Sequence, residues 1–292
     1  MDGFINFYKE SGIASNKALE RIKKILDPEK AGFLGTLDPV AAGILPVAFG
    51  WGTRFFPYFE KAPKKYRATI ILGSETDTQD STGKVTNTRP SGHITREKLL
   101  EAMEKFKGEI SQVPPMYSAK KIGGTRLYEI ARKGGEVERQ PKKVFVHSLE
   151  LDSFEGESGV FTAVVSQGTY IRTLCEDLGR LMESAAHMGA LVREGVHIFT
   201  AEGSWTLGRL EERKAFPEEW LLPLDYPLGL LPKYTAAPLE VKSLLNGRFI
   251  FYTGADSGPI RLYSQEGGFL GIGNADPITK KISPEKVIPN TR

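Results

Sequence analysis

The sequence predicts an α+β protein: a large domain with a mixed β-sheet and flanking helices, followed by a small C-terminal all-β domain. Three observations support this class. Segments with strand and helix patterns are interspersed, without the regular alternation of a doubly wound parallel sheet. The pattern changes near residues 228–238, after which short β segments are broken by Gly, Asp and Pro. The chain has 292 residues, of which 40% are apolar and 26% charged, as in a globular protein with a sizeable core.

Three segments are expected to be helices. Residues 15–26 place their apolar side chains on one face, and Ser15 is the candidate N-cap. Residues 95–108 have the same periodicity, with Thr95 as the candidate cap. Residues 171–182 follow a Gly-Thr turn signal and are again amphipathic. These segments supply the helices that flank the predicted sheet.

Two segments, residues 66–73 and 159–166, have the β-rich composition of strands. A polar, acidic loop over residues 74–85 follows the first of them. The later change of pattern divides the chain into domains at 1–232 and 233–292. The second domain, with about 60 residues, is near the lower size limit for a free domain.

The composition argues against several classes of protein. A single cysteine, Cys175, has no partner for an internal disulfide, which is compatible with a reducing cytosol. The four histidines show no metal-ligand spacing, so we expect no metal site. The first residues lack the apolar core of a signal peptide, and no run of about 18 apolar residues predicts a membrane span. We therefore expect a cytoplasmic protein that does not contact a membrane.

Charge is distributed unevenly, although the net charge is only +3. Residues 120–143 contain eight Lys or Arg against three Glu, and residues 54–67 contain five against one. Two basic stretches in a nearly neutral chain suggest a surface for a polyanion. On charge alone, two solvated loop or helix faces remain the alternative.

Asp38 is the only charged side chain in residues 33–50. An ionised Asp among apolar groups is poorly solvated and tends to take up a proton, unless a cation or several donors stabilise it. Because Pro39 follows, Asp38 also suits a turn, in which its side chain bonds to nearby N–H groups. The residues alone leave open whether Asp38 stabilises a turn or takes part in chemistry.

The stretch GFLGTLDPVAAGILPVAFG (32–50) resembles the catalytic segment of the bacterial tRNA pseudouridine-55 synthases, the TruB family. Three further blocks are similar to family motifs in the same order: KKYRATIILGSETDTQDSTGKV (64–85), QVPPMYSAKKIGGTRLYEIARKG (112–134) and GTYIRTLCEDLG (168–179). The C-terminal region, with FLGIG at 269–273, resembles a PUA RNA-binding domain. The resemblance covers nearly the whole chain.

The resemblance implies roles for four residues. Asp38 falls at the family's nucleophile, which attacks the target uridine at C1′ of the ribose or at C6 of the base. Arg172 falls at the arginine that pairs with this carboxylate and holds it ionised. Tyr66 would stack on the uracil and assist removal of the C5 proton, and Leu191 would line the uracil pocket. Without the resemblance, Tyr66 and Leu191 fit a strand core and Arg172 fits a surface position.

Phe33 is a further candidate for contact with the substrate. It departs from the family pattern, which has a histidine there; a phenyl ring can only stack or fill space. Arg193 lies in a looser match, and its role stays open. The basic tract at residues 116–133, within the block 112–134, is expected to contact the substrate RNA. Its charged candidates are Lys120, Lys121, Arg126 and Arg132.

The resemblance implies isomerisation of uridine to pseudouridine at position 55, in the T arm of tRNA, after base flipping. It implies no cofactor, no obligatory protein partner and a monomer. Two alternatives stay open: a guide-RNA-dependent pseudouridine synthase subunit, and a non-catalytic tRNA-binding or folding protein. Activity of the pure protein on a T-arm stem-loop distinguishes the three.

Overall fold

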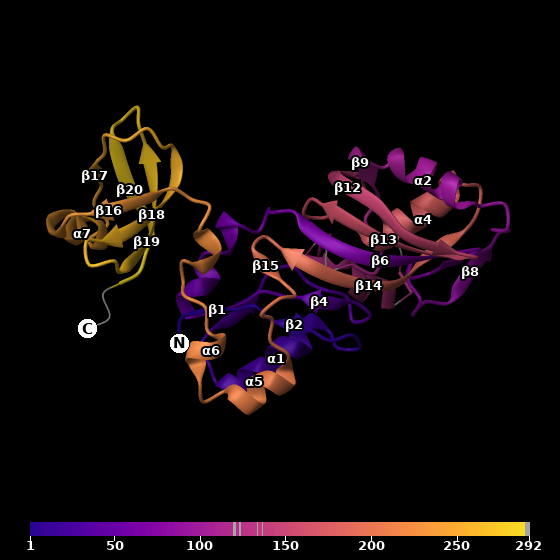
Figure 1. Cartoon of the computed structure of the whole chain (residues 1–292), viewed down its shortest axis with the longest axis horizontal. Coiled ribbons are helices and arrows are strands. Elements are labelled where there is room, and N and C mark those ends of the chain that lie inside the picture. Colours follow the sequence, from indigo (N-terminus) through magenta and orange to yellow (C-terminus); the bar gives the residue numbers. More distant parts are fainter. Residues whose placement is uncertain (119–120, 123, 133, 136, 290–292) are drawn as a thin grey trace.

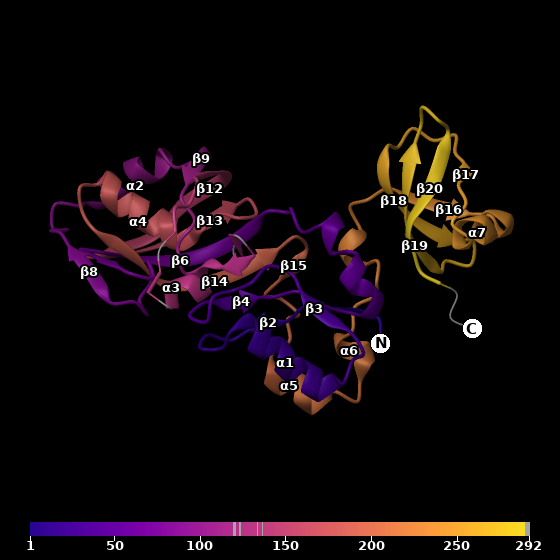
Figure 2. The same cartoon turned by 180° about the vertical axis from the view of Figure 1, so that it is seen from behind.

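The computed structural model describes residues 1–289 except 119, 120, 123, 133 and 136. The molecule is elongated: a large mixed α/β body carries a smaller β module at one end of the long axis (Figures 1 and 2). None of the helices in the described part of the chain is long and apolar enough to cross a membrane.

An eight-stranded sheet forms the centre of the large body. Its order is β2-β4-β14-β6-β13-β12-β9, with β15 added beside β14. Only β14 and β4 pair in parallel; the other neighbours are antiparallel, so the sheet is mixed as the sequence predicts. The strands are β2 (Tyr8–Lys9), β4 (Ala42–Ile44), β6 (Lys64–Leu72), β9 (Gly108–Gln112), β12 (Lys142–Glu155), β13 (Ser158–Val165), β14 (Ala186–Val196) and β15 (Phe199–Thr200).

Smaller sheets surround this centre. The sheet β1-β5-β3 lies beside α1. The segment 74–85, predicted as a loop, begins with β7, which pairs with β8 at the end of the segment, so that only the residues between the two strands form a loop. Two short strands, β10 and β11, pair within the basic tract. The bounds are β1 (Gly3–Ile5), β3 (Ala31–Phe33), β5 (Val47–Phe49), β7 (Ser74–Thr76), β8 (Val85–Thr88), β10 (Lys121–Ile122) and β11 (Thr125–Arg126).

The three predicted helices are present, and α2 and α4 lie together on one face of the central sheet (Figure 1). Thr95 caps α2 by accepting the Lys98 N–H at 3.3 Å. Ser15 is not a cap, which corrects the sequence prediction: Ala14 stands at the N-cap of α1. The helices of the body are α1 (Ser15–Leu26), α2 (Arg96–Glu104), α3 (Leu127–Arg132), α4 (Ile171–Leu181), α5 (Leu207–Arg213) and α6 (Pro217–Trp220).

Strand β6 connects the core to the pocket described below. Its side chains alternate, so that Lys64, Tyr66, Ala68, Ile70 and Leu72 are all buried on one face. The last four belong to the main hydrophobic cluster, against which the apolar face of α4 packs. The same face of one strand therefore supplies both core residues and pocket residues.

The C-terminal module has its own five-stranded sheet and its own buried cluster. The Tyr263 hydroxyl donates to Asp225 Oδ2 at 2.5 Å, and Phe269 packs edge-on against Phe55 of the body. One helix, α7, joins the sheet, and the domain division at 232–233 stays a prediction. The elements are β16 (Lys233–Ala236), α7 (Pro238–Leu245), β17 (Ile250–Phe251), β18 (Gly258–Ser264), β19 (Phe269–Asp276) and β20 (Lys281–Val287).

Candidate active site

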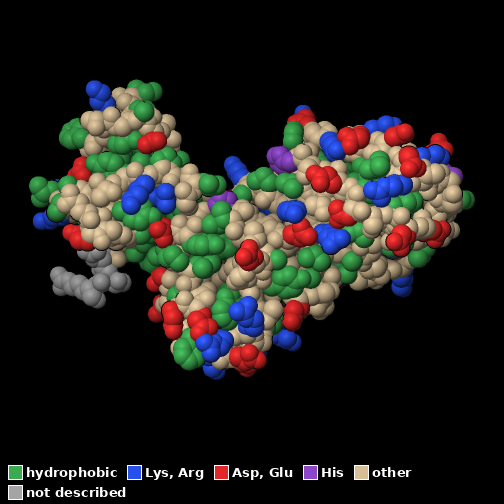
Figure 3. Space-filling model, in the orientation of Figure 1, with side chains coloured by type: hydrophobic (Ala, Val, Ile, Leu, Met, Phe, Trp, Pro, Cys, Tyr) green, Lys and Arg blue, Asp and Glu red, His purple; other side chains and the backbone are tan. Residues whose placement is uncertain are grey.

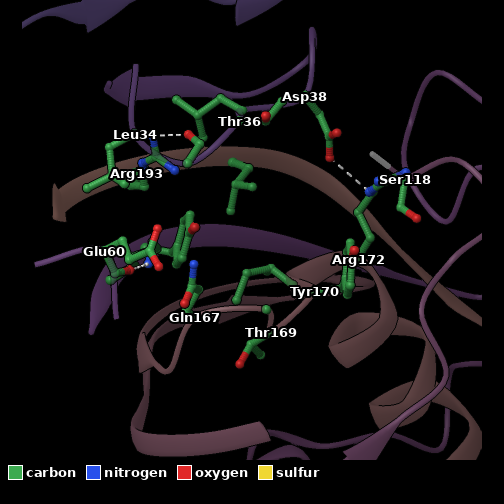
Figure 4. A pocket seen from close by; sticks show the side chains of 17 residues that line it. Leu34, Thr36, Asp38, Glu60, Ser118, Gln167, Thr169, Tyr170, Arg172 and Arg193 are labelled. Carbon is green, nitrogen blue, oxygen red and sulfur yellow. Dashed lines mark hydrogen bonds and ion pairs between the residues drawn. The ribbon is translucent and has the colours of Figure 1, made fainter. Parts of the chain in front are cut away.

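A pocket of about 210 Å³ opens where β6, β14, the start of α4 and residues 34–38 meet (Figure 4). Asp38, Tyr66, Arg172 and Leu191 all line it, although they are far apart in the sequence. Tyr66 and Leu191 are each 8% exposed and come from the neighbouring strands β6 and β14. The structure thus brings together four of the side chains that the sequence singled out.

Arg172 is the second residue of α4 and contacts three other segments of the chain. Its Nε lies 3.0 Å from Asp38 Oδ2, on the rim of the pocket. Its Nη1 donates to the Thr78 carbonyl at 2.9 Å, and its Nη2 donates to the Tyr117 carbonyl at 2.8 Å. A guanidinium presents its donors in a fixed plane, so these contacts fix the orientation in which it meets Asp38.

The environment of Asp38 pulls its pKa in opposite directions. Burial raises the pKa of the Asp38 carboxyl above its ordinary value, while the charge of Arg172 lowers it and the nearby Asp80 raises it. The raised pKa prevails, so Arg172 favours the ionised form as the sequence predicts but does not outweigh burial. Because a carboxylate of raised pKa is the more basic one, the site makes Asp38 a better nucleophile once it is ionised.

Asp80 is a functional candidate that the sequence analysis did not single out. It is 3% exposed, and its Oδ2 lies 3.5 Å from Arg172 Nη1. Its Oδ1 accepts hydrogen bonds from Thr78 Oγ1 at 2.8 Å and from the Thr82 N–H at 3.0 Å. Asp80 stands in the block 64–85 that resembles a family motif, and its burial in the structure marks it, because a buried carboxylate needs partners. Two carboxylates therefore share one guanidinium.

The chain before and after Asp38 is held by two buried polar side chains. Ser15 Oγ accepts the Leu37 N–H and donates to the Leu37 carbonyl, both at 2.9 Å. Lys9 Nζ donates to the carbonyls of Ala41 at 2.5 Å and Ile13 at 2.7 Å. Burial lowers the pKa of Lys9 to about 8. The residue predicted as a helix cap is thus a clamp on the segment that carries Asp38.

Arg193, whose role the sequence left open, is 1% exposed and lines the same pocket. Its Nε donates to the Ile44 carbonyl at 2.7 Å, and its Nη2 donates to the Gly35 carbonyl at 2.8 Å. Gly43 has φ +115°, and a Cβ there would lie 2.2 Å from the Arg193 carbonyl oxygen. Only glycine permits this approach, so Arg193 can hold both sides of the segment 35–44.

The basic stretch 54–67 does not form one basic surface, because β6 alternates. Lys65 and Arg67 are exposed and pair with Glu194 at 3.0 Å and Asp152 at 3.2 Å, whereas Lys64 is 6% exposed and lines the pocket. Acidic and basic side chains are interspersed over the face of the body seen in Figure 3. This stretch therefore supplies one buried cation to the pocket, and its other four basic residues are exposed, so their contact with a polyanion stays a prediction.

The remaining residues predicted to contact RNA are Phe33 and the four basic residues of the tract. Phe33 ends β3 and packs against the main core; it is not among the residues that line the pocket. Lys120 and the side chains of Lys121, Arg126 and Arg132 lie outside the described residues, so their contact with RNA stays a prediction.

This fold, with a carboxylate–guanidinium pair in a small pocket, is that of a pseudouridylate synthase. The chain belongs to the TruB family: the model of the TruB family pseudouridylate synthase N-terminal domain matches residues 23–171. The tRNA pseudouridylate synthase B C-terminal domain matches residues 172–229, and the C-terminal domain of pseudouridine synthase II TruB matches residues 232–288.

Relatives and solved structures agree with this membership. The tRNA pseudouridine synthase B of Caldanaerobacter subterraneus is 41% identical, over 98% of this chain and 99% of the relative; that of Azoarcus is 42% identical, over 94% and 91%. A Cbf5–Nop10–Gar1 complex contains a chain that matches with a TM-score of 0.76 at 27% identity, over 98% of this chain and 85% of that one. An H/ACA ribonucleoprotein bound to a substrate RNA matches with 0.75 at 25%, over 99% and 86%. The predicted fold class is confirmed.

Proposed function

We propose that this chain isomerises uridine 55, in the T arm of tRNA, to pseudouridine. The ion pair of Asp38 and Arg172, in a pocket lined by Tyr66 and Leu191, carries the proposal. The names of the bacterial relatives supply tRNA as the substrate. The enzyme acts in the cytoplasm, as a monomer without an obligatory protein partner.

The reaction needs the uridine to leave the RNA stack, because its glycosidic bond is otherwise out of reach of a side chain in a pocket. Tyr66 and Leu191 receive the base, and Asp38 attacks C1′ or C6. The N1–C1′ bond breaks, the uracil turns, and C5 bonds to C1′ as Asp38 leaves. The C5 proton is lost and N1 gains one. No electron is transferred to an acceptor, so the proposed reaction needs no redox cofactor.

The two parts of the chain have different roles, catalysis and RNA binding. Residues 1–232 carry the pocket, and residues 233–292 form the module that we assign to RNA binding. The basic tract with Lys120, Lys121, Arg126 and Arg132 follows Tyr117, whose carbonyl is bonded to Arg172. RNA bound by this tract would therefore lie next to the pocket.

The test is pseudouridine formation on an unmodified T-arm stem-loop, with purified wild-type protein and the Asp38→Asn variant. We expect product with the wild type alone and none with the variant. Product from both proteins would mean that Asp38 stabilises a turn and takes no part in the reaction. Binding without product from the wild type would favour a non-catalytic tRNA-binding protein.

A second candidate is a guide-RNA-dependent synthase subunit. The similarity to chains of H/ACA and Cbf5 complexes favours it. The identity of 41% to a bacterial tRNA enzyme over nearly the whole chain, against 27% for the complex, favours the stand-alone enzyme. Omitting all other RNA and protein from the assay separates the two.

A further inference from the structure

The two ends of the pocket differ in character. Asp38 and Arg172 lie at one end, and Glu60 and Arg193 lie at the other (Figure 4). The Lys64 ammonium is at the Glu60 end, where Nζ donates to the Glu60 carbonyl at 3.2 Å. A Cβ placed on Gly35 would be 3.5 Å from Lys64 Cε and 3.2 Å from Arg193 Nη1, so the two cations are neighbours.

The Lys64 ammonium is incompletely satisfied. It has two weak partners, the carbonyls of Glu60 at 3.2 Å and Ala62 at 3.3 Å. Within the described residues its third N–H has no acceptor, and no carboxylate forms an ion pair with it. Lys64 is only 6% exposed, so water does not replace these partners freely. A buried cation in this state favours a ligand that brings an acceptor oxygen.

The geometry of uracil shows which atom would reach this end. Asp38 attacks C1′, which is bonded to N1, or C6, which is next to N1 in the ring, so N1 of the base lies toward the Asp38 end in either route. In the six-membered ring C4 is opposite N1, and O4 therefore points away from Asp38, toward Lys64. O4 is an acceptor in uracil, whereas cytosine has a donating amino group at the same place.

We propose that Lys64 donates a hydrogen bond to O4 of the flipped uracil, and that this contact selects uracil over cytosine. The inference rests on the proposed function, because it uses uridine as the substrate. A site that donates to a substrate oxygen rejects an analogue that presents a donor instead. Arg193 contributes positive charge beside the same oxygen.

The same contact serves the chemical step. When N1–C1′ breaks in the C1′ route, Asp38 bonds to C1′ and the electron pair stays on the uracil, spread over N1, O2 and O4. The ammonium stabilises this anion. Rotation about the axis through N3 and C6 exchanges N1 with C5, and O4 with O2. After this rotation O2 faces Lys64. C5 bonds to C1′ as the ester bond between Asp38 and C1′ breaks. C5 then loses its proton, and N1 gains a proton.

Binding measurements in an Asp38→Asn background test the selection, because turnover is then absent. The probes are three T-arm stem-loops that differ only at the target position: uridine, cytidine or an abasic ribose. We expect Lys64→Met to weaken binding of the uridine stem-loop about tenfold and to change the cytidine one about twofold or less. Lys65→Met is the matched control, since Lys65 lies on the other face of β6; it leaves the ratio of the two affinities unchanged.

The outcomes distinguish failure of the Lys64 contact from failure of the proposed function. If uridine is preferred over cytidine equally with and without Lys64→Met, the inference is wrong, whatever the variant does to folding. If the background protein binds the uridine stem-loop no better than the abasic one, the proposed function itself fails.

A second measurement uses the wild-type Asp38. Burial and the nearby Arg193 lower the pKa of Lys64 to about 8, while Glu60 raises it. We expect kcat to fall above that pH in the wild type and to persist in Lys64→Arg, which keeps a charged donor. An identical high-pH decline in both proteins would assign the decline to Lys9, whose pKa is also about 8, and would overturn the role of the Lys64 charge.

Discussion

Two buried arginines line the same pocket, yet their partners differ in kind. Arg172, at the start of α4, contacts the carboxylates of Asp38 and Asp80 as well as two carbonyls. Arg193, on β14, donates to the carbonyls of Gly35 and Ile44. The first orients a reacting group, and the second holds the segment that carries it. Burial alone therefore does not reveal the role of a charged residue; its partners do.

The largest effect is expected from Arg172→Lys. An ammonium cannot present the planar set of donors with which the guanidinium orients Asp38. We expect kcat to fall about a hundredfold, because misplacing a reacting group by about 1 Å costs about 10²-fold in rate. Single-turnover assays measure the rate, and thermal unfolding checks that the fold is kept. A variant with nearly full activity would remove Arg172 from the mechanism.

Arg193→Met should lower stability, in addition to removing the positive charge that we place beside the uracil oxygen. It leaves the buried carbonyls of Gly35 and Ile44 without donors, at about 1–3 kcal/mol each. We expect the free energy of unfolding to drop by about 2–5 kcal/mol, measured by chemical denaturation. The comparison of the two arginines would fail if Arg193→Met unfolded like the wild type while Arg172→Lys did not.

Asp80→Asn tests the Arg172 side of this comparison through the dependence of kcat on pH. The charge of Asp80 raises the pKa of Asp38, so removing it lowers that pKa. Ionised Asp38 is the reactive form, and activity is lost as pH falls through its pKa. We therefore expect the acid limb of kcat to move to lower pH in the variant. A limb that stays in place, or moves to higher pH, would contradict the shared-guanidinium arrangement.

Ser15→Ala should give the smallest effect. It removes two hydrogen bonds to Leu37, and a typical bond contributes about 0.5–1.5 kcal/mol. We expect a loss of stability of about 1–2 kcal/mol, with tRNA affinity unchanged. Ser204→Ala, at an exposed serine that bonds within its own turn, is the control and should unfold like the wild type. Equal midpoints for both variants would leave Ser15 without a clamping role.

The sequence by itself determined the local structure. Amphipathic periodicity located the three helices, and the alternation along 64–72 could separate Lys64 and Tyr66 from Lys65 and Arg67. The lone carboxylate at Asp38 was visible as an anomaly, because an unpartnered charge among apolar residues needs an explanation. Such patterns depend on neighbours within a few positions, so a single sequence contains them.

Only the tertiary structure decided which distant groups meet. It placed Arg172 between Asp38 and Asp80. It directed the Ser15 hydroxyl to the backbone of Leu37 instead of to a helix end, and it brought Lys64 beside Arg193. These contacts join segments separated by long stretches of chain and are formed only when the sheet packs against α1 and α4. Their energies depend on burial and on the direction of each donor, neither of which is written in local periodicity.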